Sequence, residues 1–142
     1  MSQTINVTAP AQTMSVRYHG GERYEIAVRD HTVTVDQPVN AGGEDLAPTP
    51  TELFVASLAS CVAFYAGRYL SRHGLSRQGL GVAVRYRMAV DRPARITDIH
   101  VDVHVPDGLP EQRWPALKAV VEHCTVHNSL TTPPAISIDL VD

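Results

Sequence analysis

The chain has 142 residues, 44% of them hydrophobic and 19% charged, so it can bury the core of one domain and is not a disordered chain. Its formal net charge of −3 gives no basic footprint for nucleic acid, and its first ten residues lack the basic and apolar regions of a secretory signal. Two cysteines in such a chain favour a cytoplasmic protein without a framework of structural disulfides.

The N-terminal third predicts an antiparallel meander. Residues 1–13 are expected to form a loose tail or a short first strand. Apolar residues then alternate with polar ones in three short runs, with Gly20-Gly21 and Arg29-Asp30 between them as turns. The three runs are 14–18, 24–28 and 33–35. The next stretch, 36–49, has two prolines, a glycine pair and three acidic residues, which favours a loop and argues against a phosphate-binding one.

The stretch 50–73 is the longest apolar run and predicts a long helix that is buried on most sides, because it has no broad polar face. Its N-cap is expected at Thr49 or Thr51. Only 15 residues separate Glu52 from Arg68, fewer than the ~20 apolar residues that a membrane span needs. We therefore expect the core helix of a protein that makes no membrane contact.

The second half of the chain predicts two strands, a helix and a last strand. Residues 80–90 and 96–105 alternate apolar and polar side chains, as strands with one exposed face do. Residues 110–124 carry apolar residues at helical spacing, and residues 136–141 alternate again. The complete order of elements predicts an α+β fold over a single domain, 1–142, with helices packed on antiparallel sheets.

The two cysteines are the first candidates for chemistry. Cys61 lies in the long predicted helix and Cys124 lies 63 positions later, with no C-x-x-C motif that would indicate a zinc knuckle or a thioredoxin-like site. Both can be small core residues. Alternatively they meet in space, so that a Cys61 thiolate attacks a peroxide and Cys124 condenses with the sulfenic acid. A thiolate needs a cation nearby, and the candidates are Arg17, Arg23 and Arg29.

Two groups of histidines offer a weaker alternative, a metal site. One group is His123, Cys124 and His127. The other is His100 and His104 with Asp98 and Asp102, on one predicted strand. Polar residues that alternate along a half-exposed strand are ordinary solvent-facing positions, which argues against a metal site in this strand group.

Two segments of the chain carry a family resemblance. The first, AGGEDLAPTPTELFVASLASC, runs from a glycine pair through P-T-E-L into an Ala/Ser-rich helix that reaches Cys61. The second, VEHCTVHNSL, surrounds Cys124. With the element order from about Ser15 to Val141, these segments resemble the OsmC/Ohr family of osmotically inducible and organic-hydroperoxide-resistance proteins.

The resemblance implies an intertwined homodimer, in which sheets enclose long central helices and the sites lie at the interface. It also implies a thiol-dependent peroxidase that needs no cofactor and is recycled by an external dithiol. In that role Cys61 is the peroxidatic cysteine and Cys124 the resolving one. Phe54, Leu58 and Phe64 are then expected to line an apolar pocket for lipid-like hydroperoxides.

One pair of residues departs from the family pattern. The family's efficient reductases place a Glu ten residues before the first cysteine and pair it with an Arg that holds the thiolate. Here Thr51 occupies that position, and Glu52 follows it, ~100° further round the helix. Arg23, shortly after a glycine pair, is the nearest match to the Arg. The departure keeps a second function open, a non-catalytic module that binds a small ligand or senses redox state.

Overall fold

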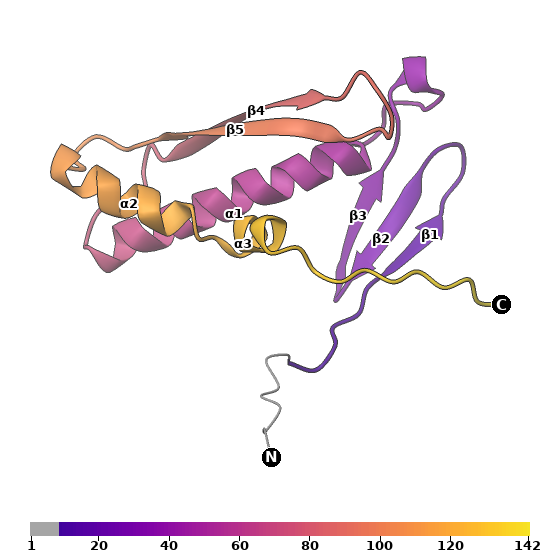
Figure 1. Cartoon of the computed structure of the whole chain (residues 1–142), viewed down its shortest axis with the longest axis horizontal. Coiled ribbons are helices and arrows are strands. Elements are labelled where there is room, and N and C mark those ends of the chain that lie inside the picture. The colour runs from indigo at the N-terminus through magenta and orange to yellow at the C-terminus, as the bar shows by residue number, and fades with distance from the viewer. Residues whose placement is uncertain (1–8) are drawn as a thin grey trace. The chain divides into compact units, whose positions relative to one another are not determined.

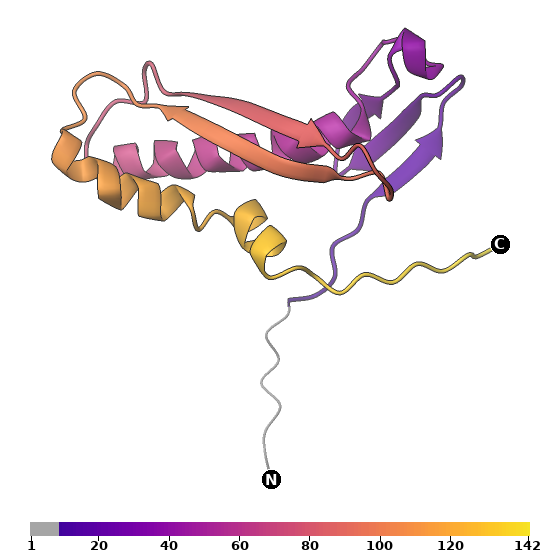
Figure 2. The ribbon, with the colours of Figure 1, turned by 45° about the horizontal axis from the view of Figure 1, so that its top comes forward.

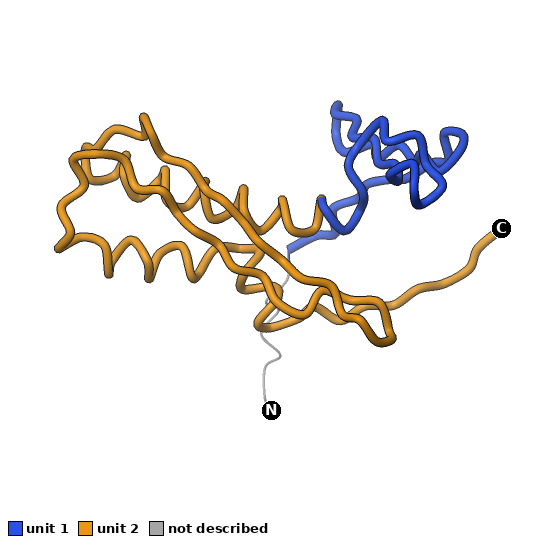
Figure 3. Tube along the Cα trace, turned by 90° about the horizontal axis from the view of Figure 1, so that it is seen from above, with its two compact units in different colours: residues 1–52 blue, residues 53–142 orange. Residues whose placement is uncertain are grey.

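A computed structural model describes residues 9–142 (Figure 1). The chain forms two compact units, residues 1–52 and residues 53–142, coloured separately in Figure 3. The expected tail or first strand over 1–13 lies mostly outside the described residues, and residues 9–14 have no regular secondary structure.

Unit 1 contains a three-stranded antiparallel meander with the strands in chain order. Its strands are β1 (Ser15–Tyr18), β2 (Tyr24–Val28) and β3 (His31–Val35). Gly20 and Gly21 have positive φ angles of 99° and 54° in the first turn, where glycine is needed to follow the strand twist. Arg29, in the second turn, also has a positive φ, 51°. The predicted meander and both of its turns are confirmed.

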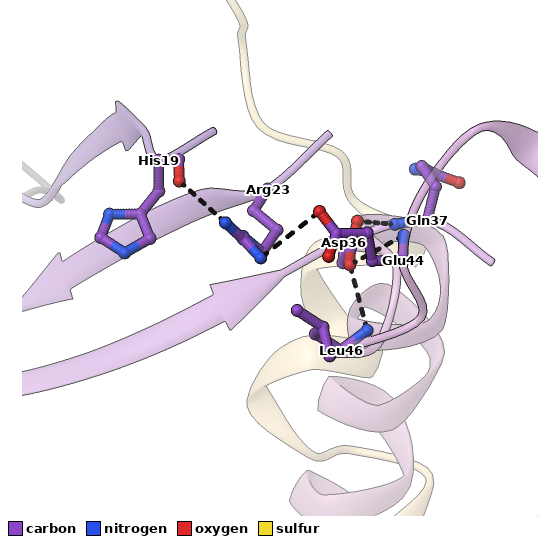
Figure 4. A network of polar contacts seen from close by, with 6 residues as sticks. All are labelled: His19, Arg23, Asp36, Gln37, Glu44 and Leu46. Carbon is purple, nitrogen blue, oxygen red and sulfur yellow. Dashed lines mark hydrogen bonds and ion pairs between the residues drawn. The ribbon is translucent and has the colours of Figure 1, made fainter. Parts of the chain in front are cut away.

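Asp36, directly after β3, organises the loop that follows. The residue is only 1% exposed, and its carboxylate accepts hydrogen bonds from the backbone N–H groups of Gln37 (2.7 Å), Glu44 (3.3 Å) and Leu46 (3.0 Å), as Figure 4 shows. The bond from Leu46 is the largest influence that lowers the pKa of Asp36. The loop, which includes one 3-10 turn, η1 (Val39–Ala41), is therefore folded around a buried carboxylate.

The long helix is confirmed as α1 (Pro50–Arg72). Its N-cap is Thr49, whose Oγ1 accepts the N–H of Glu52 at 3.0 Å, while Glu52 Oε1 accepts the N–H of Thr49 at 2.8 Å. This reciprocal pair is a capping box. At the other end Gly74 adopts a left-handed conformation, φ 67°, and stops the helix.

Unit 2 builds its core between α1, an antiparallel hairpin and a shorter helix (Figures 1 and 2). These elements are β4 (Gly81–Met88), β5 (Ile96–His104) and α2 (Trp114–Val121). The core side chains are Leu58, Val62, Ala66, Tyr69 and Leu70 from α1, with Leu117, Val121 and Cys124.

The buried residues of α1 recur every three or four positions and so lie on one face of the helix. Phe54 and Phe64 stay 44% and 54% exposed. The expectation that the helix is buried on most sides is therefore wrong within this chain. By length and hydropathy alone α1 could cross a membrane, but the core helix of a water-soluble domain meets the same test, and seven of its residues are buried.

The region before Cys124 differs from the single helix predicted over 110–124. A 3-10 turn, η2 (Glu111–Arg113), leads into α2, which ends at Val121. A separate helix, α3 (Thr125–Thr131), begins after Cys124. The helix is interrupted because Cys124 is extended, with φ −68° and ψ 155°, and caps α3 instead of continuing α2.

The predicted last strand over 136–141 is wrong for this chain by itself. The segment pairs with no described strand, and its apolar side chains are exposed: Ile136 (81%), Ile138 (85%), Leu140 (99%) and Val141 (91%). The alternation of a strand is present, but a strand forms only where a neighbouring edge accepts its hydrogen bonds. No edge within the described residues does so.

Candidate functional site

Cys61 and Cys124 come together in unit 2. Cys61, which is partly exposed, packs against the hydrophobic cluster that contains the buried Cys124. Both are free thiols, and the two side chains are close enough for the Cys61 thiol to perturb the titration of Cys124. The fold thus brings two cysteines from distant segments to one hydrophobic cluster, and one of them is partly exposed to solvent.

Cys124 lies in an environment that keeps it protonated. The residue is 0% exposed, and this burial is the main cause that raises the pKa of its thiol, with a further contribution from the neighbouring Cys61 thiol. Its Sγ accepts the backbone N–H of His127 at 3.4 Å as the N-cap of α3, which opposes the shift. A thiolate is the nucleophile in thiol chemistry, so the accessible Cys61 is better suited to react first.

A second contact joins the same two segments. The hydroxyl of Tyr65, one turn after Cys61 on α1, lies 2.8 Å from Oγ1 of Thr125, which follows Cys124. The Tyr65 ring meets the ring of Phe64 edge to face, with centroids 5.8 Å apart. Sequence reasoning missed this contact, although Tyr65 is four residues from one cysteine and Thr125 is adjacent to the other.

Unit 2 also contains an apolar cavity of about 780 Å³ between α1, β5, α2 and α3. Leu58 lines it, as expected, but Phe54 and Phe64 do not. Neither cysteine lines it directly, although Val121 and His127, which flank Cys124 in sequence, both do. The other lining residues are Val62, Ile99, Val101, Val103, Val105, Glu111, Trp114, Pro115, Leu117, Lys118 and Glu122.

Arg23, the predicted cation, lies in unit 1 after the first turn of the meander (Figure 4). One terminal nitrogen donates to the carbonyl of His19 at 3.4 Å, and the other lies 3.6 Å from Glu44 Oε1. Its Nε is buried without a hydrogen-bond partner among the described residues. The guanidinium therefore retains a donor that unit 1 does not use.

Glu52, the predicted carboxylate, is occupied at the start of α1 by the capping box with Thr49. Glu52 is exposed, and its hydrogen bond to the backbone N–H of Thr49 gives it a structural role at the start of the helix.

The histidine groups do not support a metal site. Within residues 9–142 no three His, Cys, Asp or Glu side chains are grouped so that they could hold a metal ion. His123 is bonded to the Ala119 carbonyl at 2.7 Å, and His100 to Asp102 at 2.8 Å. These contacts are ordinary interactions at a helix end and between neighbouring side chains on one face of a single strand.

Comparison with known proteins identifies the family. The sequence model of the family described as OsmC-like protein matches residues 42–139, well over half of the chain and including both cysteines. The chain belongs to the OsmC-like family. The resemblance seen in the sequence is thereby confirmed. No curated protein matches the sequence of this OsmC-like chain.

Solved structures share the α+β fold of this OsmC-like protein. A Psychrobacter arcticus 273-4 protein, described as an osmotic stress induced and detoxification response protein, superposes with a TM-score of 0.76 at 25% identity, covering 87% of this chain and 91% of that one. The organic hydroperoxide resistance protein OsmC of Legionella pneumophila has a TM-score of 0.60 at 21% identity, with coverages of 87% and 91%.

A third structure, from Vibrio cholerae O1 biovar eltor str. N16961, is described as an organic hydroperoxide resistance protein with captopril bound in one of its active sites. Its TM-score is 0.66 at 15% identity, and the match covers 92% of each chain. The expected α+β architecture of antiparallel sheets with a long helix is therefore confirmed. The family includes organic hydroperoxide resistance proteins.

Proposed function

We propose that this OsmC-like protein is a thiol-dependent peroxidase that reduces organic hydroperoxides with Cys61 and Cys124. The observation that supports this most strongly is the meeting of the two thiols within one cluster, although they are 63 positions apart in sequence. A pair of cysteines used only for packing has no need to be adjacent, whereas disulfide chemistry requires it.

In the proposed reaction Cys61 is the peroxidatic residue, because it is the more accessible thiol. Its thiolate attacks the distal peroxide oxygen, the O–O bond breaks, and the alkoxide takes a proton and leaves as an alcohol. Cys61 is then a sulfenic acid. The Cys124 sulfur attacks the Cys61 sulfur, the S–O bond breaks, and water leaves as the disulfide forms. An external dithiol reduces the disulfide and is itself oxidised to a cyclic disulfide.

We propose Arg23 as the cation that supports the Cys61 thiolate on the strength of the family resemblance. Glu52 is the nearest sequence equivalent of the family's carboxylate, and we propose that its main contribution is to the start of α1. Arg23→Gln should then slow the reaction with hydroperoxide, whereas Arg29→Gln, in the next turn of the meander, should leave its rate unchanged.

The substrate class follows from the apolar walls of the cavity next to the cysteine segments. Its volume of about 780 Å³ is within the range of pockets that hold a drug-sized molecule. We propose that it receives the organic portion of a lipid-like hydroperoxide, with Leu58 as part of its lining.

We propose further that the protein acts as a homodimer in the cytoplasm. The alternating apolar side chains of 136–141 and the exposed Phe54 and Phe64 on α1 are surfaces that a second copy would cover. The two free thiols suit a reducing compartment. Sedimentation equilibrium tests the assembly: a mass of two chains is expected, and a monomer at micromolar concentration would refute it.

Turnover of cumene hydroperoxide with dithiothreitol as the dithiol tests the function. Wild type should consume hydroperoxide, Cys61→Ser should consume none, and Cys124→Ser should accumulate sulfenic or over-oxidised Cys61. Equal consumption by wild type and Cys61→Ser would reject the assignment.

The second candidate is a module that binds a small apolar ligand or reports redox state without turnover. It is favoured by the cavity, which neither cysteine lines. Binding of a fluorescent fatty acid to both wild type and Cys61→Ser, in a protein that fails to turn over hydroperoxide, would select it.

A further inference from the structure

The cysteine segments touch at two places. Cys61 and Tyr65 are four residues apart on α1 and so face the same side of that helix. Cys124 and Thr125 are consecutive, at the N-cap and the first position of α3. The sulfur pair and the 2.8 Å hydroxyl pair of Tyr65 and Thr125 therefore bridge the same two segments, one helical turn apart.

The segment that carries Cys124 is anchored in the core of unit 2 by Cys124 itself and by the partly buried Val126, and the rest of it is held more loosely. α3 has seven residues and none of them is buried, and α2 has already ended at Val121. An element with little buried surface opens at low cost, so its position depends on individual contacts. Contacts on α1 hold the Tyr65 ring in place for such a contact. The ring packs edge to face against Phe64, and the Phe64 ring in turn lies 5.6 Å from the Arg68 guanidinium.

We propose that Tyr65 is a positioning residue, whose hydrogen bond to Thr125 holds Cys124 in front of Cys61 for disulfide closure. The inference rests on the proposed thiol chemistry. A disulfide forms only over a narrow range of distance and dihedral angle, so the rate of closure depends on how often the resolving sulfur occupies that geometry. Loss of the hydroxyl bond lets the start of α3 move away without removing either sulfur.

The test uses diamide, so that it does not depend on peroxidase activity. One thiolate adds to the N=N bond of diamide, and the other nitrogen takes up a proton. The second thiolate then attacks the sulfur of this adduct, the S–N bond breaks as the disulfide forms, and the hydrazine leaves with a second proton and the two electrons. Acid quenching, alkylation and mass spectrometry at successive times give the rate of adduct formation at Cys61 and the rate of closure separately. The protein is used as the full chain.

Two variants each remove one hydroxyl of the pair, and two further variants serve as controls. Tyr65→Phe keeps the ring and its contact with Phe64, Thr125→Val keeps the size of the side chain, and Thr125→Ser keeps the hydroxyl. Tyr69→Phe is the matched control, because it makes the same chemical change one turn along α1, where the hydroxyl bonds to nothing in residues 9–142. Thermal unfolding of each variant checks that the fold is retained.

Tyr65→Phe and Thr125→Val should each slow closure about fivefold, equivalent to ~1 kcal/mol, with adduct formation unchanged. The double variant should be no slower than either single one, because all three lack the same bond. Thr125→Ser and Tyr69→Phe should close at the wild-type rate. Closure at the wild-type rate in both single variants, or slowing in the double variant that equals the product of the two, would overturn the proposal.

The peroxidase proposal fails separately. If wild type does not consume cumene hydroperoxide but the diamide closure is slowed as expected, the peroxidase assignment is rejected and the positioning role of Tyr65 stands. If hydroperoxide is consumed and closure is unaffected, only the positioning role is rejected.

Discussion

The difference in burial between the two thiols makes a prediction about their reactivity in the reduced protein. Cys124 is fully buried, whereas Cys61 is partly exposed. An alkylating reagent can reach Cys124 only when the start of α3 opens. Opening exposes the Cys124 side chain and breaks two hydrogen bonds, the one between the Tyr65 and Thr125 hydroxyls and the one from the His127 N–H to the sulfur.

The size of the effect follows from these contacts. Exposing a small apolar side chain costs ~1 kcal/mol and each hydrogen bond is worth ~0.5–1.5 kcal/mol net, so opening costs about 2–4 kcal/mol. Because 1.4 kcal/mol is a factor of ten, Cys124 should be alkylated ~30- to 700-fold more slowly than Cys61. The raised pKa of Cys124 adds to this difference, since the thiolate is the reactive form.

Monobromobimane labelling with peptide mapping measures both rates. Cys61→Ser and Cys124→Ser isolate one thiol each, and labelling in guanidinium chloride should make the two rates equal. Tyr65→Phe should speed the labelling of Cys124 and leave that of Cys61 unchanged. Equal rates for the two cysteines in the folded protein, or faster labelling of Cys124, would refute the reasoning.

Three further predictions concern stability. Leu70 lies in the core and is 1% exposed, so Leu70→Ala should lower the free energy of unfolding by ~2–5 kcal/mol. Val90 is fully exposed, so Val90→Ala should change the free energy of unfolding by less than ~0.5 kcal/mol in the same urea titration. Thr49→Ala should cost ~1 kcal/mol by removing the N-cap, and Glu52→Gln, which keeps the capping box, should cost less; a larger loss from Glu52→Gln would contradict the capping role. Because the pKa of Asp36 is lower in the folded state than its usual 3.8, its contribution is present above pH ~4 and is lost as the pH falls through the folded value. The protection factor of the Leu46 amide, which corrects for the intrinsic pH dependence of exchange, should therefore fall in acid, and a protection factor that stays constant as the pH falls would contradict this prediction.

Much of the fold could be predicted from local pattern. Alternation over 14–35 and 80–105 identified the five strands, and the apolar run from Pro50 identified α1, because these signals depend on residues close in sequence. The same alternation over 136–141 gave a strand that this chain does not form. Whether an alternating segment becomes a strand depends on a partner edge, and the segment's own sequence does not contain that information.

The candidate site was less accessible to sequence reasoning. The residue type identified Cys61 and Cys124 as candidates, but it could not tell a redox pair from two core residues, and the family resemblance was needed to connect them. The contact between Tyr65 and Thr125 joins residues 60 positions apart, and no local pattern marks such a pair. The split between α2 and α3 was missed because a cysteine sulfur, an unusual cap, begins the second helix.

Non-reducing peptide mapping after one equivalent of cumene hydroperoxide tests the central claim most directly. The account predicts a cross-linked peptide pair that joins Cys61 to Cys124 within one chain, with one molecule of cumyl alcohol released for each disulfide formed. Two free thiols with the hydroperoxide intact, or a disulfide that joins any other pair of sulfurs, would contradict it.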